Sequence, residues 1–366
     1  MSLEQGVSNT LVWCIYQDRK GFLWYGTMYG LVKYDGYEYI TYRHDPSDTT
    51  SIGNDDVLAI CEDHRDGLWV GTYGGGVSRL DRTTGTFTCY RHGAGGNTLA
   101  DNTVWDILED HDGTIWCATD KGGLDRFDET TRGFTHFRPP PLDPRHPRTT
   151  AVLSLCEGSN STLWVGTAGN GLQRFDRRVG TFTPSLHNAS DTSSIGSNSI
   201  SAVVRDTSGR LWIGTRGAGL DMYRPETGRF EHFRNIPGAK AGLPSDNINR
   251  LVGDESGVLW VATTAGLARF DIRMRTFLTF RSDPSHPEGL SSNRVTALLR
   301  DRTGMLWVGT YHGGLDRLIM GKVKFPRVGN GPSTPGVISG NEVTALLEDR
   351  KGRLWVGTRG GLDRFD

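Results

Sequence analysis

The sequence predicts an all-β protein, a β-propeller built from four-stranded antiparallel blades. Two observations carry this prediction: a tryptophan-centred motif recurs eight times in 366 residues, and short apolar runs separated by glycine-rich turns fill each interval. The motif tryptophans, 45 to 48 residues apart, are Trp24, Trp69, Trp116, Trp164, Trp212, Trp260, Trp307 and Trp355. A fixed period of this length with several short strands in each period is typical of propeller blades.

The repeat from residue 54 to residue 92 shows the expected order of strands. Residues 57–61 form an apolar run that fits an inner strand buried on both faces. Residues 68–72, 77–81 and 86–90 follow as three further strands, separated by polar or glycine-containing turns. No repeat contains an amphipathic helical stretch, so the sequence excludes a helical solenoid.

Recurring residues in this repeat are expected to build the scaffold rather than a site. Trp69 is expected to wedge between neighbouring blades, and the small Gly71 to let a neighbouring strand approach closely. Thr72 is expected to bond backbone at the strand end, and Asp63 to bond its own turn. Arg79 and an acidic residue two places on share one strand face, from which they can reach partners across strands.

The number of blades follows less directly from the repeats. Eight copies favour a single propeller domain of eight blades over residues 1–366, and a seven-bladed ring with one leftover unit is the alternative. An outer strand is weakly indicated at residues 323–326, and only residues 1–6 precede the first repeat to help close the ring. Because the chain begins and stops almost directly on a repeat, we expect it to be a fragment of a longer protein.

Composition narrows the function classes. Forty-one basic residues balance forty-two acidic ones, which disfavours a nucleic-acid partner. No apolar run is long enough to insert into a membrane, and the first residues lack a signal peptide's apolar core. The histidines and cysteines show no metal-ligand spacing, so neither a metal nor another cofactor is expected.

The repeats closely resemble those of the two-component regulator propeller family. The resemblance rests on strings such as LWYGTMYGLVKYD at 23–35 and LWVGTRGGLDRFD at 354–366, and it covers the whole chain. It implies the extracytoplasmic, periplasmic sensory region of a membrane-anchored bacterial regulator, commonly a hybrid histidine kinase. It also implies a downstream signalling domain in the same chain, possible homodimers, and, as in several members, a response to carbohydrates.

Residues that break the repeat symmetry are the candidate site, because scaffold residues should recur in every blade whereas ligand-binding residues should not. Near the start of the first strands these are Trp13, Trp105, Asp106, Asn249, Arg250, Arg294 and Glu342. The loops between second and third strands add, on the same face of the ring, Tyr73, Arg216, Tyr311 and His312. Aromatic faces beside carboxylates and guanidinium groups suit a sugar, although the same residues would also serve as a solvated channel rim.

Three functions compete on this scaffold. A sensory propeller would bind a carbohydrate or similar small polar ligand, an oligosaccharide for example, and relay the signal to another module. A propeller enzyme, a lyase or hydrolase of glycans, would need a carboxylate pair, for which Asp106 and Glu342 are the pair to test. An assembly platform would bind proteins only. The sensory function is the one that we expect, with no catalytic residue assigned.

Overall fold

The computed structural model describes residues 11–36, 38–95, 97–140, 151–238, 242–283, 285, 289–318, 343–348, 354–358 and 361–365. All regular elements within these ranges are β-strands. The chain divides into two compact units, Met1–Leu318 and Ile319–Asp366. In the described ranges no helix has the length and apolar character needed to cross a membrane.

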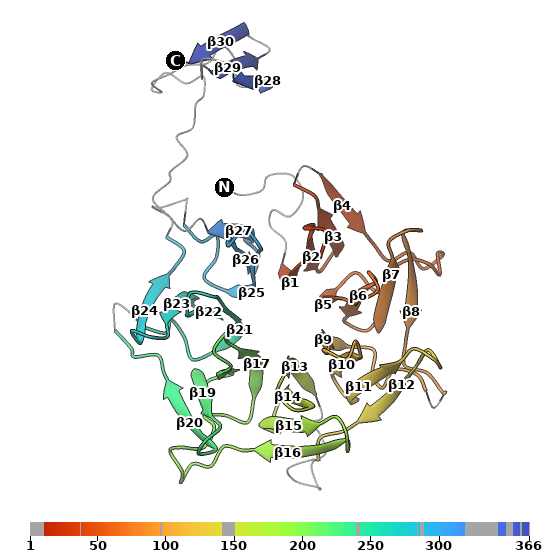
Figure 1. Ribbon diagram of the computed structural model, residues 1–366, viewed down its shortest axis with the longest axis vertical. Coiled ribbons are helices and arrows are strands. Elements are labelled where there is room, and N and C mark those ends of the chain that lie inside the picture. Colours follow the sequence, from red (N-terminus) through yellow and green to blue (C-terminus); the bar gives the residue numbers. More distant parts are fainter. Residues whose placement is uncertain are drawn as a thin grey trace. The chain divides into compact units, whose positions relative to one another are not determined.

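The first unit is a seven-bladed propeller (Figure 1). Its strands pair antiparallel in sequence order within each blade. Blades 1 to 3 consist of β1 (Val12–Gln17), β2 (Leu23–Thr27), β3 (Gly30–Tyr34), β4 (Tyr39–Tyr42); β5 (Val57–Glu62), β6 (Leu68–Thr72), β7 (Val77–Asp81), β8 (Thr86–Tyr90); β9 (Val104–Glu109), β10 (Ile115–Thr119), β11 (Gly123–Asp128), β12 (Gly133–Phe137).

The remaining blades repeat this arrangement. Blades 4 to 6 consist of β13 (Val152–Glu157), β14 (Thr162–Thr167), β15 (Leu172–Asp176), β16 (Thr181–Ser185); β17 (Ile200–Arg205), β18 (Leu211–Thr215), β19 (Leu220–Arg224), β20 (Arg229–Phe233); β21 (Ile248–Gly253), β22 (Val258–Thr263), β23 (Gly266–Asp271), β24 (Thr276–Phe280). Blade 7 has three described strands, β25 (Val295–Arg300), β26 (Leu306–Thr310) and β27 (Gly314–Leu318).

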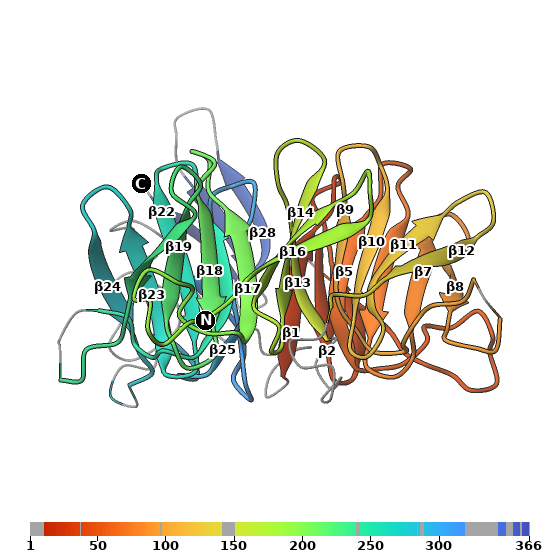
Figure 2. The same ribbon diagram turned by 90° about the horizontal axis from the view of Figure 1, so that it is seen from below.

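The first strand of each blade stands at the centre of the ring, and later strands lie progressively further out (Figure 1). Seen from the side, the strands run across the thickness of the ring (Figure 2). The first strands therefore surround a central channel, in the inner position expected for the apolar run at residues 57–61: β1, β5, β9, β13, β17, β21 and β25. Because each blade repeats the same hairpins, residues at equivalent repeat positions meet around this channel.

The ring closes between blade 7 and blade 1. The Thr296 hydroxyl of β25 donates a hydrogen bond to the backbone oxygen of Val12 in β1, at 2.5 Å. The Arg302 backbone N–H donates to the side-chain oxygen of Gln17, at 2.8 Å. Val12 also shares a core cluster with Trp307 of β26. Blade 7 thus packs directly against blade 1.

The prediction of eight blades is wrong, and the seven-bladed alternative is correct. The physical reason is that β1 occupies the place beside β25 and β26 into which an eighth blade would have to fit. The eighth repeat instead forms a separate three-stranded antiparallel sheet in the second unit, β28 (Val343–Glu348), β29 (Leu354–Thr358) and β30 (Gly361–Phe365). The expected outer strand at 323–326 and the N-terminal residues 1–6 lie outside the described residues.

The small residue of the motif lets neighbouring blades approach, as predicted. A methyl group at Gly71 would lie 2.9 Å from a methyl carbon of Val104, in the first strand of the next blade. At the ring closure a methyl group at Gly309 would lie 2.9 Å from Val12 in the same way. The motif threonine also has its predicted role, because the Thr72 hydroxyl donates to the carbonyl of Gly76 at 3.0 Å.

The motif aspartate links the first hairpin to the tryptophan. One carboxylate oxygen of Asp63 accepts the backbone N–H of Gly67 at 2.8 Å, as a turn residue should. The other oxygen accepts the indole N–H of Trp69, also at 2.8 Å. The same indole bond joins the pairs Trp24–Asp18, Trp116–Asp110, Trp212–Asp206 and Trp307–Asp301. We name this arrangement the Asp–Trp clamp.

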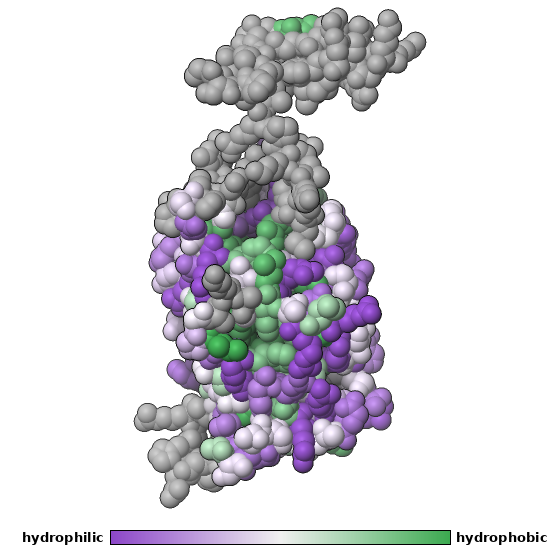
Figure 3. Space-filling view, turned by 90° about the vertical axis from the view of Figure 1, so that its left-hand side faces the viewer, coloured by the Kyte–Doolittle hydropathy of each residue, from purple (hydrophilic) through white to green (hydrophobic). Residues whose placement is uncertain are grey.

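The side of the ring that faces the viewer in Figure 3 is largely hydrophilic, with an apolar strip running along it. On the side of β24 and β27 an apolar groove of about 400 Å³ is lined by, among others, Phe280, Leu290 and Leu318. This groove lies away from the channel, so it does not contribute to the site described next.

Candidate functional site at the mouth of the channel

Every blade places one irregular residue at the same end of the channel. In blade 2, Val57 pairs with Thr72 and Ala59 with Gly71, so that Leu58 is an extra, bulged residue. Such a bulge re-aims a side chain out of the regular alternation of a strand. All seven first strands shift register at this position, and the seven bulged residues line one cavity: Trp13, Leu58, Trp105, Leu153, Ser201, Asn249 and Thr296.

The cavity has a volume of about 390 Å³, which is within the usual range of small-molecule sites. Blades 5 to 7 and the loops beside them complete its lining with Arg216, Asn247, Ile248, Arg250, Thr264 and Arg294. We call this cavity the channel mouth.

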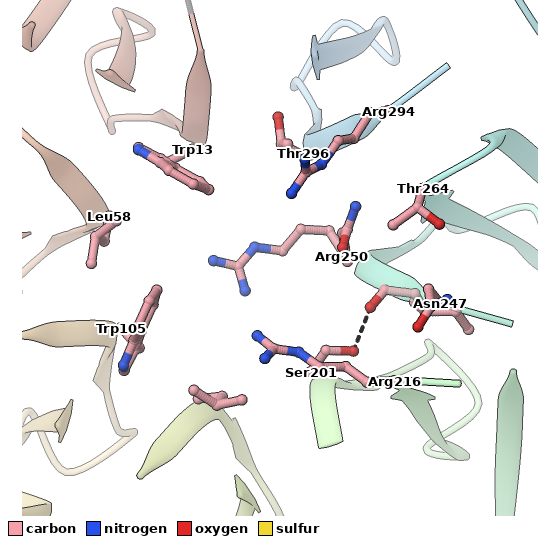
Figure 4. Close-up of a pocket in the computed structure, with 13 residues that line it drawn as sticks. Trp13, Leu58, Trp105, Ser201, Arg216, Asn247, Arg250, Thr264, Arg294 and Thr296 are labelled. Carbon is pink, nitrogen blue, oxygen red and sulfur yellow. Dashed lines mark hydrogen bonds between the residues drawn. The ribbon is translucent and has the colours of Figure 1, made fainter. Parts of the chain in front are cut away.

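The channel mouth has two chemically different sides. Blades 1 to 4 contribute only apolar or aromatic bulged residues, whereas blades 5 to 7 contribute Ser201, Asn249, Thr296 and three arginines. Figure 4 shows Trp13 and Trp105 on one side and the Arg250 guanidinium group reaching into the middle. The repeat symmetry of the ring is therefore broken where a ligand would meet it.

Hydrogen bonds orient both tryptophans. The indole N–H of Trp13 donates to Asp56 at 2.6 Å, and that of Trp105 donates to Asp120 at 3.0 Å. Burial raises the pKa of Asp56, and the bond from Trp13 offsets only part of that effect. Tyr73 packs edge-on against Trp105, with ring centroids 6.5 Å apart. With their polar groups occupied, the two indoles offer apolar ring surface to the cavity.

The polar bulged residues also tie neighbouring blades together. The Ser201 hydroxyl donates to the backbone oxygen of Ile248 at 2.5 Å (Figure 4). The side-chain amide of Asn249 donates to the backbone oxygen of Val295 at 2.6 Å. One of the two side-chain N–H donors of Asn249, a predicted ligand-binding residue, is therefore already used by the scaffold.

The three arginines carry the charge of the mouth. Among the described residues none of Arg216, Arg250 and Arg294 forms an ion pair. The Arg294 guanidinium lies over the ring of Tyr311, 4.1 Å from its centroid, which favours a fixed orientation.

Asp106 lies deeper in the channel than predicted. It lines a second cavity of about 200 Å³, which it shares with Arg250. Its carboxylate accepts the backbone N–H of Leu155 in the next blade at 2.8 Å and that of Ile107 at 3.0 Å. Burial raises the pKa of Asp106, while the charge of Arg250 and these two bonds offset part of the rise. Asp106 thus joins blades 3 and 4.

The structure brings together six of the eleven predicted site residues: Trp13, Trp105, Asn249, Arg250, Arg294 and Arg216 all line the channel mouth. Tyr73 contacts the lining residue Trp105 and Tyr311 contacts the lining residue Arg294, and the His312 ring lies 4.1 Å from that of Tyr311. Glu342 lies outside the described residues. Lining residues that the prediction did not select are Leu58, Leu153, Ser201, Asn247, Ile248, Thr264 and Thr296.

Four of these unselected residues stood at the bulge position, eleven residues before each tryptophan, which was the signal for them. Nowhere in the described ranges do three histidine, cysteine, aspartate or glutamate side chains gather as metal ligands would.

The repeats match a known family. The model of the two component regulator propeller matches seven stretches of the chain, residues 6–29, 51–74, 98–121, 194–217, 242–265, 289–312 and 338–360. The chain belongs to the two-component regulator propeller family. No curated protein matched it.

Solved structures show the same fold. The extracellular domain of a B. thetaiotaomicron protein described as a hybrid two component system, BT3049, aligns with a TM-score of 0.74 and 24% identity, over 100% of this chain and 47% of that one. A catalytically inactive virginiamycin B lyase from Staphylococcus aureus with quinupristin aligns with a TM-score of 0.65 and 14% sequence identity. This alignment covers 87% of this chain and 98% of the lyase chain. The chain thus spans about half the length of the first protein. At these identities each likeness shows the fold alone.

Proposed function

We propose that this chain is the sensory propeller of a two-component regulator of the hybrid histidine kinase type. It binds a carbohydrate or similar small polar ligand at the channel mouth and relays binding to a downstream signalling domain of the same chain. The observation that carries the proposal is the asymmetry of the mouth, where oriented tryptophans face a polar, cationic side within one cavity of about 390 Å³.

The chemistry of the mouth supports a sugar. Pyranose rings present C–H faces that pack on indoles, and Trp13 and Trp105 are held for such packing by bonds to carboxylates. Sugar hydroxyls need donors and acceptors on the other side, where Asn247, Thr264 and the arginines lie.

The location and the relay rest on the family and on the fold shared with an extracellular domain. We propose an extracytoplasmic, periplasmic position and an output through a kinase module, with homodimers as the signalling form. Lining residues come from all seven blades, so a bound ligand would contact the whole ring at once.

The proposal is tested by probing a glycan array with the labelled chain and titrating the best ligand by calorimetry. Trp105→Ala should weaken binding at least about tenfold, which corresponds to about 1.4 kcal/mol. The control Leu278→Ala removes an apolar side chain that is 53% exposed on the outer strand β24, and it should bind like the wild type.

Two results would contradict this function. If the chain binds no glycan on the array, the ligand is not a carbohydrate. If Trp105→Ala binds the ligand as tightly as the wild type, the channel mouth is not the binding site. Turnover of a bound glycan that disappears in Asp106→Asn would instead assign a propeller enzyme.

A further inference from the structure

We infer that the ligand of the channel mouth carries an anionic group, a carboxylate or a sulfate, on its sugar ring; the ligand is an acidic saccharide. This inference rests on the proposed function and specifies its ligand class. It also assigns an orientation, with the acidic group toward blades 5 to 7 and the ring face toward the tryptophans of blades 1 and 3.

The charges that line the mouth point to an anion. Three of its lining residues are arginines, and the described lining includes no aspartate or glutamate. Two carboxylates beside the mouth have another role: Asp56 and Asp120 accept the indole N–H groups of Trp13 and Trp105 on the opposite side. Asp106 lies below the mouth, where its charge acts on Arg250.

The positions of the arginines fit one shared anion. They come from consecutive blades: Arg216 follows β18 in blade 5, Arg250 lies in β21 of blade 6, and Arg294 precedes β25 of blade 7. Figure 4 shows the Arg250 side chain extending into the cavity between the other two. The planar guanidinium fork matches the geometry of a carboxylate or a sulfate and binds it through paired hydrogen bonds.

Like charges gathered around one cavity repel one another, and this repulsion is relieved when an anion binds. The stacking of Arg294 on Tyr311 restricts that side chain before the ligand arrives, which lowers the entropic cost of binding. A neutral sugar would gain the contacts with the tryptophans but would form no ion pair with Arg216, Arg250 or Arg294.

The test compares matched ligands on the complete chain. A glycan array carries uronic-acid oligosaccharides, their neutral methyl esters, sulfated oligosaccharides and neutral oligosaccharides, and calorimetry follows on the best pair. We expect the acidic member to bind at least tenfold more tightly than its neutral counterpart, with the difference shrinking as salt is raised. The uronic-acid and sulfated arms distinguish the two sources of the anion.

Substitutions of the three arginines test whether they cause the preference for the acidic ligand. Arg250→Gln should weaken binding of the acidic ligand at least tenfold and leave the neutral counterpart within about threefold. Because Arg250 lines the same deeper cavity as Asp106, the exposed pair Arg216→Gln and Arg294→Gln provides a second test that spares the channel interior. Arg273→Gln, an exposed arginine in the turn between β23 and β24, is the matched control and should change nothing.

The results distinguish a failure of the anionic ligand from a failure of the sensory function. Equal binding of acidic and neutral ligands, or wild-type affinity in all three arginine variants, would overturn the anionic ligand and leave the sensory function standing. Failure of every glycan to bind would overturn both.

Discussion

At the scale of single residues, two arginines with largely buried side chains that are not part of the repeat motif join neighbouring blades. Arg82, whose side chain is 12% exposed, follows β7 in blade 2 and contacts Asp18 of blade 1 at 3.1 Å. Arg177 follows β15 in blade 4 and pairs with Asp110 of blade 3; its side chain is 6% exposed. Removing one partner of a buried ion pair is costly because the remaining charge loses its counter-charge in a poorly solvated place.

Arg177→Met is therefore expected to lower the free energy of unfolding by about 3 kcal/mol, measured by urea denaturation. The neighbouring Arg178→Met is the matched control, because Arg178 is exposed and its substitution should change stability by at most about 0.5 kcal/mol. Equal effects of the two substitutions would show that the buried pair does not hold blades 3 and 4 together.

At the scale of the hairpin, the Asp–Trp clamp makes the stability of the fold depend on acid. Burial by itself raises the pKa of Asp63, but bonds from Trp69, Gly67 and Arg79 outweigh it and hold this pKa below the ordinary value of 3.8. The pKa values of Asp206 and Asp301 are lowered in the same way, against burial, by bonds that include those from Trp212 and Trp307. The clamps of Asp63, Asp206 and Asp301 therefore stabilise the folded state above pH 3.8 and lose this effect as the pH falls through the folded pKa values.

Asp63→Asn should consequently destabilise the protein by about 1–3 kcal/mol at pH 7, since one oxygen that accepted a hydrogen bond becomes a donor. The difference in unfolding free energy between wild type and variant should shrink as the pH falls from 3.8 through the lowered folded pKa of Asp63, because the wild-type carboxylate is protonated first in the unfolded and then in the folded state. Urea titrations at several pH values measure this difference. A difference that stays constant with pH would contradict the electrostatic role of the clamp.

The strands of a blade were predictable from sequence because they form between neighbours in the chain. The runs expected at 57–61, 68–72, 77–81 and 86–90 are observed as Val57–Glu62, Leu68–Thr72, Val77–Asp81 and Thr86–Tyr90. The bulge at Leu58 was not predicted, because a bulge exists only relative to the register of the paired strand. The inter-blade bond of Asn249 was missed for a related reason: it joins residues 46 positions apart.

At the scale of the whole molecule, the number of blades could not be obtained from repeats that look alike. It depends on which first strand packs beside β25, and this is decided by the summed angles between blades rather than by any local motif. The contact between Gly309 and Val12 is specific to a seven-bladed ring, since an eighth blade would separate these residues.

A double-mutant cycle at this contact tests the number of blades. Gly309→Ala should cost about 1–3 kcal/mol in the wild type, because the added methyl would lie 2.9 Å from Val12. In a Val12→Ala background the cost should fall by at least about 0.5 kcal/mol. Val104→Ala, which removes the equivalent residue beside Gly71, is the control and should be additive with Gly309→Ala. If the effects of Gly309→Ala and Val12→Ala on the unfolding free energy are also additive, the ring does not close after seven blades.

Across the whole molecule the ring is a scaffold, and function lies where its blades differ. Hydrogen–deuterium exchange with the best array ligand measures this most directly. Protection is expected in residues 11–17, 102–107 and 246–251, which carry Trp13, Trp105 and Arg250, and none is expected in the first hairpins at the opposite end of the channel. Protection confined to those hairpins or to the outer strands, with the channel mouth unchanged, would contradict the account.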